Sequence, residues 1–357
     1  MTSAHVAIGL ALGAVTAAAS LAGCLGQVDT SSTAMRLAAR GPDAGAAPAQ
    51  GASSPPTASV LLALGYPPDA LTNDAEYVYW SELNSVFRAS KLSPVRERLF
   101  GDGTSPASSI AVDDAFVYAV DVMRGSVRAW RKSADAMEIV VPEGSGARSL
   151  AQDDANLYVG TTEGGGGVRV ISKASHEAVG TLRAGARVTQ VAISGATVFT
   201  AEIQPDDRVH IVRSSTGGAG EDVVGASDSP PYQLVAAGED AYWTEARGLV
   251  STRSAAPLYA PSAGAFVASG LSVLDGNVYV TEMGRRADGG EGALVRVPLG
   301  GGAPSVVAKL TIDAPPNAFR AYGVRQTSDA ASVYVSAYWT SDTGSARGDI
   351  IARVPVR

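Results

Sequence analysis

A short apolar run that contains an aromatic residue recurs seven times along the chain. The runs centre on Tyr79, Tyr118, Tyr158, Phe199, Tyr242, Tyr279 and Tyr334. Successive centres are 39, 40, 41, 43, 37 and 55 residues apart, and each run follows a turn rich in Asp, Asn, Ser or Gly. A period near 40 residues with this alternation of apolar runs and turns is typical of the four-stranded blades of a β-propeller.

Each copy divides into four short apolar segments, which predict four antiparallel strands. In the second copy they are Ser109–Val112, Phe116–Tyr118, a segment that contains Arg131, and Glu138–Val141, with the turn Asp113-Asp114 after the first. We therefore predict an all-β fold, a seven-bladed propeller over residues 58–357, with six blades as the alternative.

The seventh copy ends at Ile350–Val354 and has no fourth segment. The run Ser59–Leu64 lies before the first copy and belongs to none. We expect this N-terminal strand to fill the outer position of the last blade, because the ring would otherwise be left open with an unpaired strand edge.

Polar residues also recur at fixed repeat positions. Adjacent carboxylates in the turns could indicate acid–base catalysis or calcium binding, but their repetition favours turn formation by side-chain capping. An acid follows the aromatic by three residues in five copies, and an Arg stands in the third segment of six. We expect the two to pair across the hairpin as a structural feature. The acids are Glu82, Asp121, Glu202, Glu245 and Glu282, and the arginines are Arg88, Arg131, Arg213, Arg253, Arg296 and Arg353.

Two copies resemble a known repeat. Tyr79-Trp80-Ser81-Glu82 and Tyr242-Trp243-Thr244-Glu245, each followed by an apolar-x-Arg strand, look like degenerate YWTD (LDL-receptor class B) repeats. NHL-type propellers have a similar rhythm. The resemblance covers about residues 68–357 and implies a propeller that binds proteins. YWTD propellers typically have six blades, whereas this chain has seven copies.

The N-terminus has the features of a processing signal. Val6–Ala19 is apolar or small throughout and too short to span a bilayer comfortably. It leads to Leu21-Ala22-Gly23-Cys24, which contains the only cysteine of the chain. This resembles a bacterial lipoprotein signal, with residues 1–23 removed and Cys24 lipidated. The alternatives are an ordinary secretory signal and a short core helix. Met1–His5 lacks the usual Lys or Arg.

Residues 24–57 are rich in Ala, Gly, Pro, Ser and Thr without helical or strand periodicity. We expect a flexible tether that holds the propeller on a membrane of the cell envelope. The outer membrane, the cell surface and a periplasm-facing position all remain open.

Composition limits the chemistry. Hydrophobic residues make up 46% and charged residues 18%, which allows a large core, and the net charge of −7 argues against a nucleic-acid partner. After cleavage only His176 and His210 remain, at different repeat positions. We therefore expect no zinc or haem site, no serine triad and no cofactor. We also expect the protein to be a monomer without catalytic activity.

A binding surface is expected where the loops between the second and third strands meet the blade-to-blade loops, since these share one face of a propeller. The residues just before each first strand should surround the channel mouth, and Tyr338, Trp339 and the long loop Glu282–Ala293, with Arg285 and Arg286, should lie near its rim. The predicted ring is Asp69, Ser108, Arg148, Thr189, Tyr232, Ser269 and Tyr322.

These residues favour non-catalytic binding of a protein, peptide or glycan of the envelope. The alternative is a lyase or hydrolase that uses carboxylates and a divalent cation, although Asp69 is the only acid in the predicted ring. A purely structural role in envelope assembly is a third hypothesis.

Overall fold

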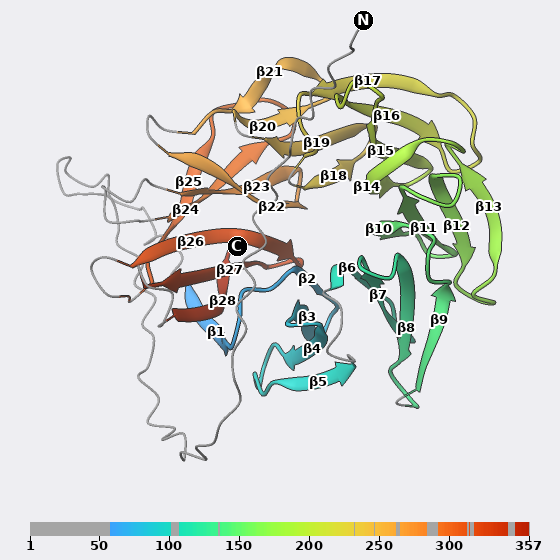
Figure 1. The fold of residues 1–357 in the computed structure, drawn as a ribbon. Helices are drawn as coiled ribbons and strands as arrows, with labels where there is room; N and C mark the ends of the chain where they lie inside the picture. The colour runs from blue at the N-terminus through green and yellow to red at the C-terminus, as the bar shows by residue number, and fades with distance from the viewer. Residues whose placement is uncertain are drawn as a thin grey trace, which may run out of the picture. The chain divides into compact units, whose positions relative to one another are not determined.

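Seven four-stranded antiparallel sheets are arranged in a ring in this computed structural model (Figure 1). The structure describes residues 58–100, 107–134, 136–231, 233–245, 247–261, 265–283, 292–312, 314, 318–341 and 347–356. All of them belong to one unit, Met35–Arg357. Within these ranges, no helix has the length and apolar character needed to cross a membrane. The predicted signal, Cys24 and the tether lie outside the described residues.

Blades 1 to 7 follow the chain, and in each the first strand is innermost. Blades 1 to 3 comprise β2 Ala70–Asn73, β3 Tyr77–Glu82, β4 Ser85–Ser90 and β5 Glu97–Phe100; β6 Ala107–Val112, β7 Phe116–Asp121, β8 Ser126–Arg131 and β9 Ala136–Val141; and β10 Ala147–Gln152, β11 Asn156–Thr161, β12 Gly167–Ser172 and β13 Ala178–Leu182. Blades 4 and 5 comprise β14 Arg187–Ser194, β15 Thr197–Ile203, β16 Val209–Ser215 and β17 Asp222–Ser227; and β18 Leu234–Ala237, β19 Asp240–Glu245, β20 Gly248–Ser251 and β21 Ser254–Tyr259. Blades 6 and 7 comprise β22 Phe266–Leu274, β23 Asn277–Met283, β24 Gly292–Pro298 and β25 Ser305–Leu310; and β26 Phe319–Ser328, β27 Ser332–Thr340, β28 Arg347–Pro355 and β1 Ser59–Leu64.

The N-terminal strand closes the ring. β1 pairs antiparallel with β28, from Ser59 opposite Arg353 to Leu64 opposite Asp349. The strand therefore occupies the outer position of blade 7, beside the C-terminal end of the chain (Figure 1). Both the seven-bladed fold and its closure by β1 are confirmed, and the six-blade alternative is wrong.

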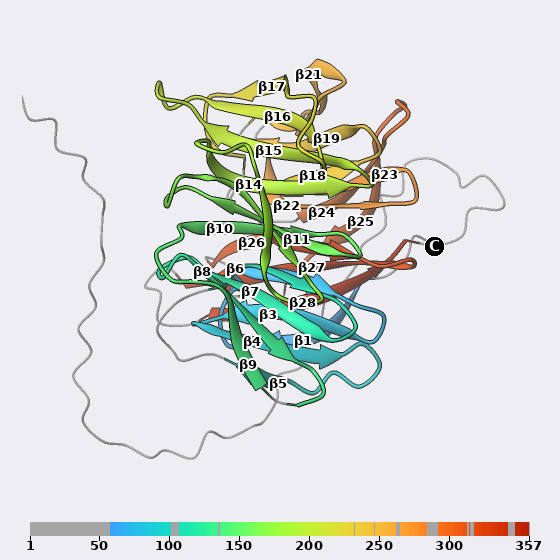
Figure 2. The same ribbon diagram turned by 90° about the vertical axis from the view of Figure 1, so that its right-hand side faces the viewer.

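The repeat aromatics lie in the interfaces between blades. All seven are buried, with at most 3% of their surface exposed. The buried apolar residues of the described chain form seven clusters, each shared by two neighbouring blades and each containing the aromatic of the earlier blade. The sheets stack face to face around the axis, as Figure 2 shows from the side. One aromatic per interface explains why the repeat is so regular, because each buries a large apolar area.

The turn after the inner strand is built on a capping carboxylate. Asp74 Oδ1 accepts hydrogen bonds from the backbone N–H groups of Glu76 and Tyr77 at 2.9 and 2.8 Å. Its Oδ2 accepts from the hydroxyl of Tyr79 at 2.6 Å and from Lys132 of the next blade at 2.8 Å. The prediction that these acids form turns is therefore confirmed.

The same network recurs in neighbouring blades. Asp113, Asp153 and Asp329 each cap two backbone N–H groups and accept from the tyrosine five residues later. Lysines then link neighbouring blades: Lys173 lies 3.2 Å from Asp113, and Lys91 lies 2.7 Å from Asp329 across the closure of the ring. Blades 7, 1, 2 and 3 are thus connected at this face.

The predicted pairing of the repeat acid with the repeat Arg is wrong. The register places Arg88 opposite Tyr79 rather than Glu82, and Arg88 instead binds Glu97 of the outer strand at 2.7 Å. Glu82 is buried and pairs with Arg96 at 3.0 Å. An acid that ends one strand lies opposite the start of the next, so the Arg several residues along that strand is out of its reach.

Candidate functional site at the channel mouth

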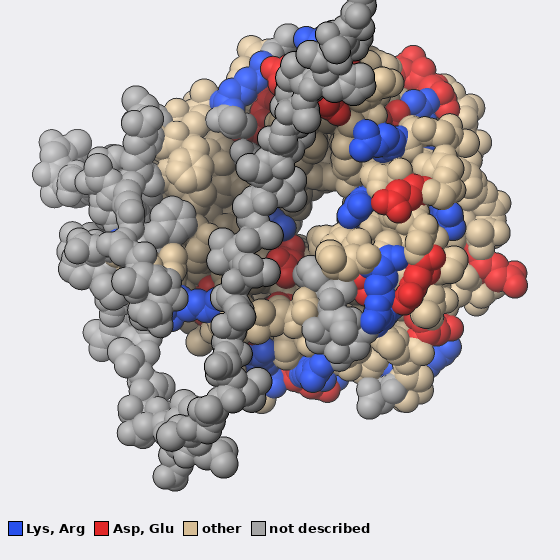
Figure 3. All heavy atoms as spheres, viewed as in Figure 1, with Lys and Arg blue, Asp and Glu red and all other residues tan. Residues whose placement is uncertain are grey.

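The inner strands surround a cavity of about 610 Å³ at the centre of the ring. Figure 3 shows an opening at this place on the molecule's surface. Inner strands of all seven blades contribute to the cavity wall. Half of the lining residues are Ser, Thr, Gln or Arg and half are Ala, Val, Leu or Ile, so the wall combines apolar surface with polar groups that could orient a ligand.

The predicted ring residues of blades 2 to 4 are the extra residues of β-bulges. The strand register skips Ser108, Arg148 and Thr189, so that each is unpaired in its sheet. A bulge changes the direction of the side chain at the end of a strand. All three line the cavity at the end where the inner strands begin.

Arg148 is the exposed cation of this mouth. Its Nε donates to the hydroxyl of Thr162 at 3.2 Å, and its Nη2 lies 3.8 Å from Glu163 in the loop between β11 and β12. Its side chain is 40% exposed. Asp69 stands at the equivalent position of blade 1, where burial raises the pKa of its carboxyl and the charge of Arg325 opposes that rise.

Tyr322 does not belong to the ring. It is 1% exposed within the interface of blades 6 and 7, and its hydroxyl accepts a hydrogen bond from the backbone N–H of Ile312 at 3.1 Å. β26 contains an irregularity between Tyr322 and Gln326, with Gly323 at a φ of 66°. Val324, rather than Tyr322, stands ten residues before the aromatic of its blade, as Asp69 and Arg148 do in theirs.

Ser269 does not line the cavity, and its hydroxyl donates to the carbonyl of Val324 at 2.7 Å. The other predicted residues divide into two groups. Tyr232, Arg285 and Arg286 lie outside the described residues. Tyr338 and Trp339 are partly buried near the end of β27, where they pack against the cluster between blades 6 and 7. The indole N–H of Trp339 is buried and has no acceptor among the described residues.

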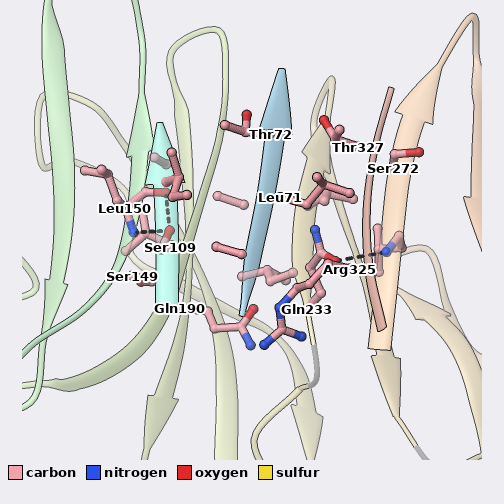
Figure 4. A pocket seen from close by; sticks show the side chains of 18 of the residues that line it. Leu71, Thr72, Ser109, Ser149, Leu150, Gln190, Gln233, Ser272, Arg325 and Thr327 are labelled. Atoms are coloured by element: carbon pink, nitrogen blue, oxygen red, sulfur yellow. Dashed lines mark hydrogen bonds between the residues drawn. The ribbon is translucent and has the colours of Figure 1, made fainter. Parts of the chain in front are cut away.

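Three longer side chains at this end of the cavity were missed. They are Gln190, Gln233 and Arg325, and Figure 4 shows them at one end of the cavity, with Thr72 and Thr327 towards the other. A signal for them was present in the sequence, since each stands nine residues before the aromatic of its own blade. Counting back nine residues from Tyr334 gives Arg325, because the pairing of β26 is regular from Gln326 onwards. Counting forward from the preceding loop gives Tyr322, because the irregularity of β26 lies after that residue.

Several inner-strand side chains form hydrogen bonds with the backbone of a neighbouring blade. Ser109 Oγ accepts from the N–H of Leu150 at 3.2 Å, and Gln233 Oε1 accepts from the N–H of Leu271 at 3.0 Å. Gln152 donates to the carbonyl of Val112 at 2.6 Å. These bonds satisfy groups on the inner strand edges that no further strand pairs.

No group of three or more His, Cys, Asp and Glu side chains in the described residues is placed to hold a metal ion. His176 lies away from the cavity, with Nδ1 2.9 Å from Glu138 and its ring against Phe116. His210 lines a separate pocket between blades 4 and 5.

Comparison with known proteins supports the fold and gives no family. No family model and no curated protein matches the chain. A chain of the mitotic checkpoint complex matches with a TM-score of 0.59 and 12% identity over 89% of this chain and 96% of its own. The computationally designed Ika8 protein matches with a TM-score of 0.51 and 10% identity over 83% and 98%.

A third similar structure is PorZ of Porphyromonas gingivalis, described as a bacterial surface component of the type-IX secretion system. It matches with a TM-score of 0.49 and 14% identity, over 79% of this chain and 38% of PorZ. At these identities the similarities concern the fold alone. The seven four-stranded sheets themselves define the class of protein as a β-propeller.

Proposed function

We propose that the protein is a non-catalytic binding module, anchored to a membrane of the cell envelope, whose propeller binds a protein, peptide or glycan at the mouth formed by Asp69, Arg148, Gln190, Gln233 and Arg325. The observation that carries the proposal is that Arg148, Gln190, Gln233 and Arg325 line one open cavity of about 610 Å³, with Asp69 next in sequence to Ala70 of its wall. At the other face, the turn carboxylates of four blades are bonded into the fold. Polar groups that converge on a cavity are the usual form of a ligand site.

Arg148→Glu tests the site, because it reverses the exposed charge of the mouth. We expect the purified protein to lose capture of its partner from envelope extracts and any glycan bound on an array. Arg213→Glu is the control, since Arg213 lies on β16 away from the cavity and pairs with Asp222 at 3.1 Å. Equal capture by wild type and both variants would refute the proposed site.

The anchor is tested separately. The sequence Leu21-Ala22-Gly23-Cys24 supports lipidation of Cys24, and each buried acyl methylene contributes about 0.8 kcal/mol to membrane binding. Mass spectrometry of the mature N-terminus should show an acylated cysteine as the first residue, and Cys24→Ser should release the protein from membranes. An unmodified Cys24 in the mature protein would rule out the anchor.

A further inference from the structure

One arginine stands among seven equivalent residues of the inner strands. Each lies nine residues before its repeat aromatic, and the seven are Ala70, Ser109, Ser149, Gln190, Gln233, Gly270 and Arg325. Arg325 is the only charged residue of this set. Its neighbours around the ring are Gly270 in blade 6 and Ala70 in blade 1. A Cβ on Gly270 would lie 2.3 Å from the carbonyl oxygen of Gly323, so blade 7 packs directly against this glycine.

Arg325 is bonded to neutral oxygens only. Its Nε donates to the backbone carbonyl of Asp69, and its Nη1 donates to the carbonyl of Val324 at 2.9 Å. Among the described residues no carboxylate forms an ion pair with it, although the charge of Asp69 acts on it from a distance. A guanidinium has five N–H groups, so donors remain for a ligand.

The site around Arg325 favours an anion. Burial lowers the pKa of Arg325, and Asp69 opposes that effect. An arginine nonetheless stays protonated at neutral pH. A partly dehydrated cation beside an open cavity gains more from a carboxylate than a hydrated surface cation does, because water screens their charge-assisted hydrogen bonds less.

The two glutamines complete the site. Gln233 Oε1 accepts from the N–H of Leu271, which leaves its amide nitrogen to donate into the cavity. Gln190 Nε2 donates to the carbonyl of Pro231 at 2.5 Å, which leaves its Oε1 to accept. The mouth thus offers donors for a carboxylate next to an acceptor for a hydroxyl.

We infer that Arg325 and Gln233 form a carboxylate-binding subsite for an acidic sugar, with Gln190 accepting a hydrogen bond from a neighbouring sugar hydroxyl. This inference rests on the proposed function and names its ligand class. A sugar is favoured over an extended peptide because backbone groups of the inner strands, such as Leu150 N–H and Leu271 N–H, are already bonded to side chains of the neighbouring blade. A peptide strand would have to displace those bonds.

Methyl glucuronide and methyl glucoside are the matched probes, since they differ only in a carboxylate at C6. Ligand-observed NMR titration of the purified full chain should show the glucuronide binding at least about tenfold more tightly. Equal binding of the two sugars would overturn the inference. Preferential binding of a short peptide with a free C-terminus over its amidated form and over the glucuronide would overturn the sugar assignment.

Gln233→Glu tests the subsite in a protein that should fold. The substituted carboxylate keeps an acceptor for Leu271 N–H but replaces the donor with a negative charge, so glucuronide binding should fall by at least about tenfold. Arg325→Gln should have the same effect, and Arg213→Gln, on the outer part of blade 4, should have none. If glucuronide does not bind while Arg148→Glu still abolishes capture of another partner, the subsite is wrong and the proposed binding function stands.

Discussion

At the scale of single residues, equivalent tyrosines differ in the partner of the hydroxyl. Tyr79 donates to Asp74 at 2.6 Å, whereas the hydroxyl of Tyr242 is buried without a partner among the described residues. The turn of blade 5 carries Gly238-Glu239 instead of the capping Asp. Burial of the aromatic side chain is therefore common to all seven blades. The hydrogen bond from its hydroxyl to a capping Asp is an addition found in some of the blades.

This difference predicts opposite results for one substitution. Tyr79→Phe removes a hydrogen bond to a charged acceptor and should lower the free energy of unfolding by about 1.5–3 kcal/mol. Tyr242→Phe removes an unpaired buried hydroxyl and should be neutral or slightly stabilising. Urea unfolding of the two variants measures both, and an equal loss in each would contradict the assignment.

Asp349 is a buried carboxyl at the end of the closing sheet. It is 1% exposed, and neither of its oxygens has a hydrogen-bond partner among the described residues. Burial raises its pKa to about 6, against the influence of Arg347, whose Nε lies 3.5 Å away, and with the help of Glu82. The folded state therefore binds a proton that the unfolded state releases at about pH 4, so stability falls as pH rises from about 4 to 6.

Asp349→Asn should remove this pH dependence. The variant should be more stable than wild type by about 1–3 kcal/mol at pH 8 and little different at pH 4. Urea unfolding at the two pH values measures the difference. Asp222→Asn, at an exposed pair on β17, is the control and should change stability by less than about 0.5 kcal/mol at either pH. A variant that loses stability at pH 8 would show that the charged form of Asp349 is needed.

At the scale of elements, blade 7 contains two strands that depart from the repeat. β1 comes from the opposite end of the chain, and β26 carries extra residues around Gly323. A Cβ on Gly323 would lie 2.3 Å from Thr281 of blade 6, so this residue has room for no side chain. The last blade therefore combines closure of the ring with the strand that presents Arg325.

Deletion of residues 57–66 should abolish cooperative unfolding, because it removes β1 and leaves the edge of β28 unpaired. Differential scanning calorimetry of the purified protein measures this. Deletion of residues 41–50 from the predicted tether is the length-matched control and should leave the transition unchanged. A melting curve unchanged by the first deletion would refute closure by β1.

At the scale of the whole molecule, the ring is held by apolar interfaces and, over four blades, by the network of Asp, Tyr and Lys. Burial by itself raises the pKa of Asp329, but hydrogen bonds from Lys91, from the backbone of Ala331 and from Tyr334 outweigh it and lower the pKa to about 2. The pKa values of Asp74, Asp113 and Asp153 are lowered for similar reasons. A carboxyl whose pKa is lowered stabilises the fold above its unfolded pKa and loses that contribution in acid.

The protein should therefore lose stability steadily as pH falls from about 4 to 2. Lys91→Met removes the cation that joins blade 1 to blade 7 and that lowers the pKa of Asp329. This variant should therefore be less stable than wild type at pH 7 and should lose less stability between pH 4 and 2. Thermal unfolding between pH 2 and 7 measures it. Lys309→Met, on the outer strand β25, is the control, and an identical acid profile for Lys91→Met and wild type would contradict the role of the network.

The sequence determined the architecture by itself. Seven aromatic centres at a period near 40, a missing last segment and a spare N-terminal strand predicted seven blades and their closure, because burial of one aromatic per interface forces a regular local pattern. Tertiary structure alone decided the members of the channel mouth. Arg325 and Asp69 stand 256 positions apart and meet because the ring closes, and Tyr322 left the predicted site because extra residues in one strand shifted its register. Side-chain direction depends on bulges and on the neighbouring blade, and neither is visible in the apolar pattern of a single repeat.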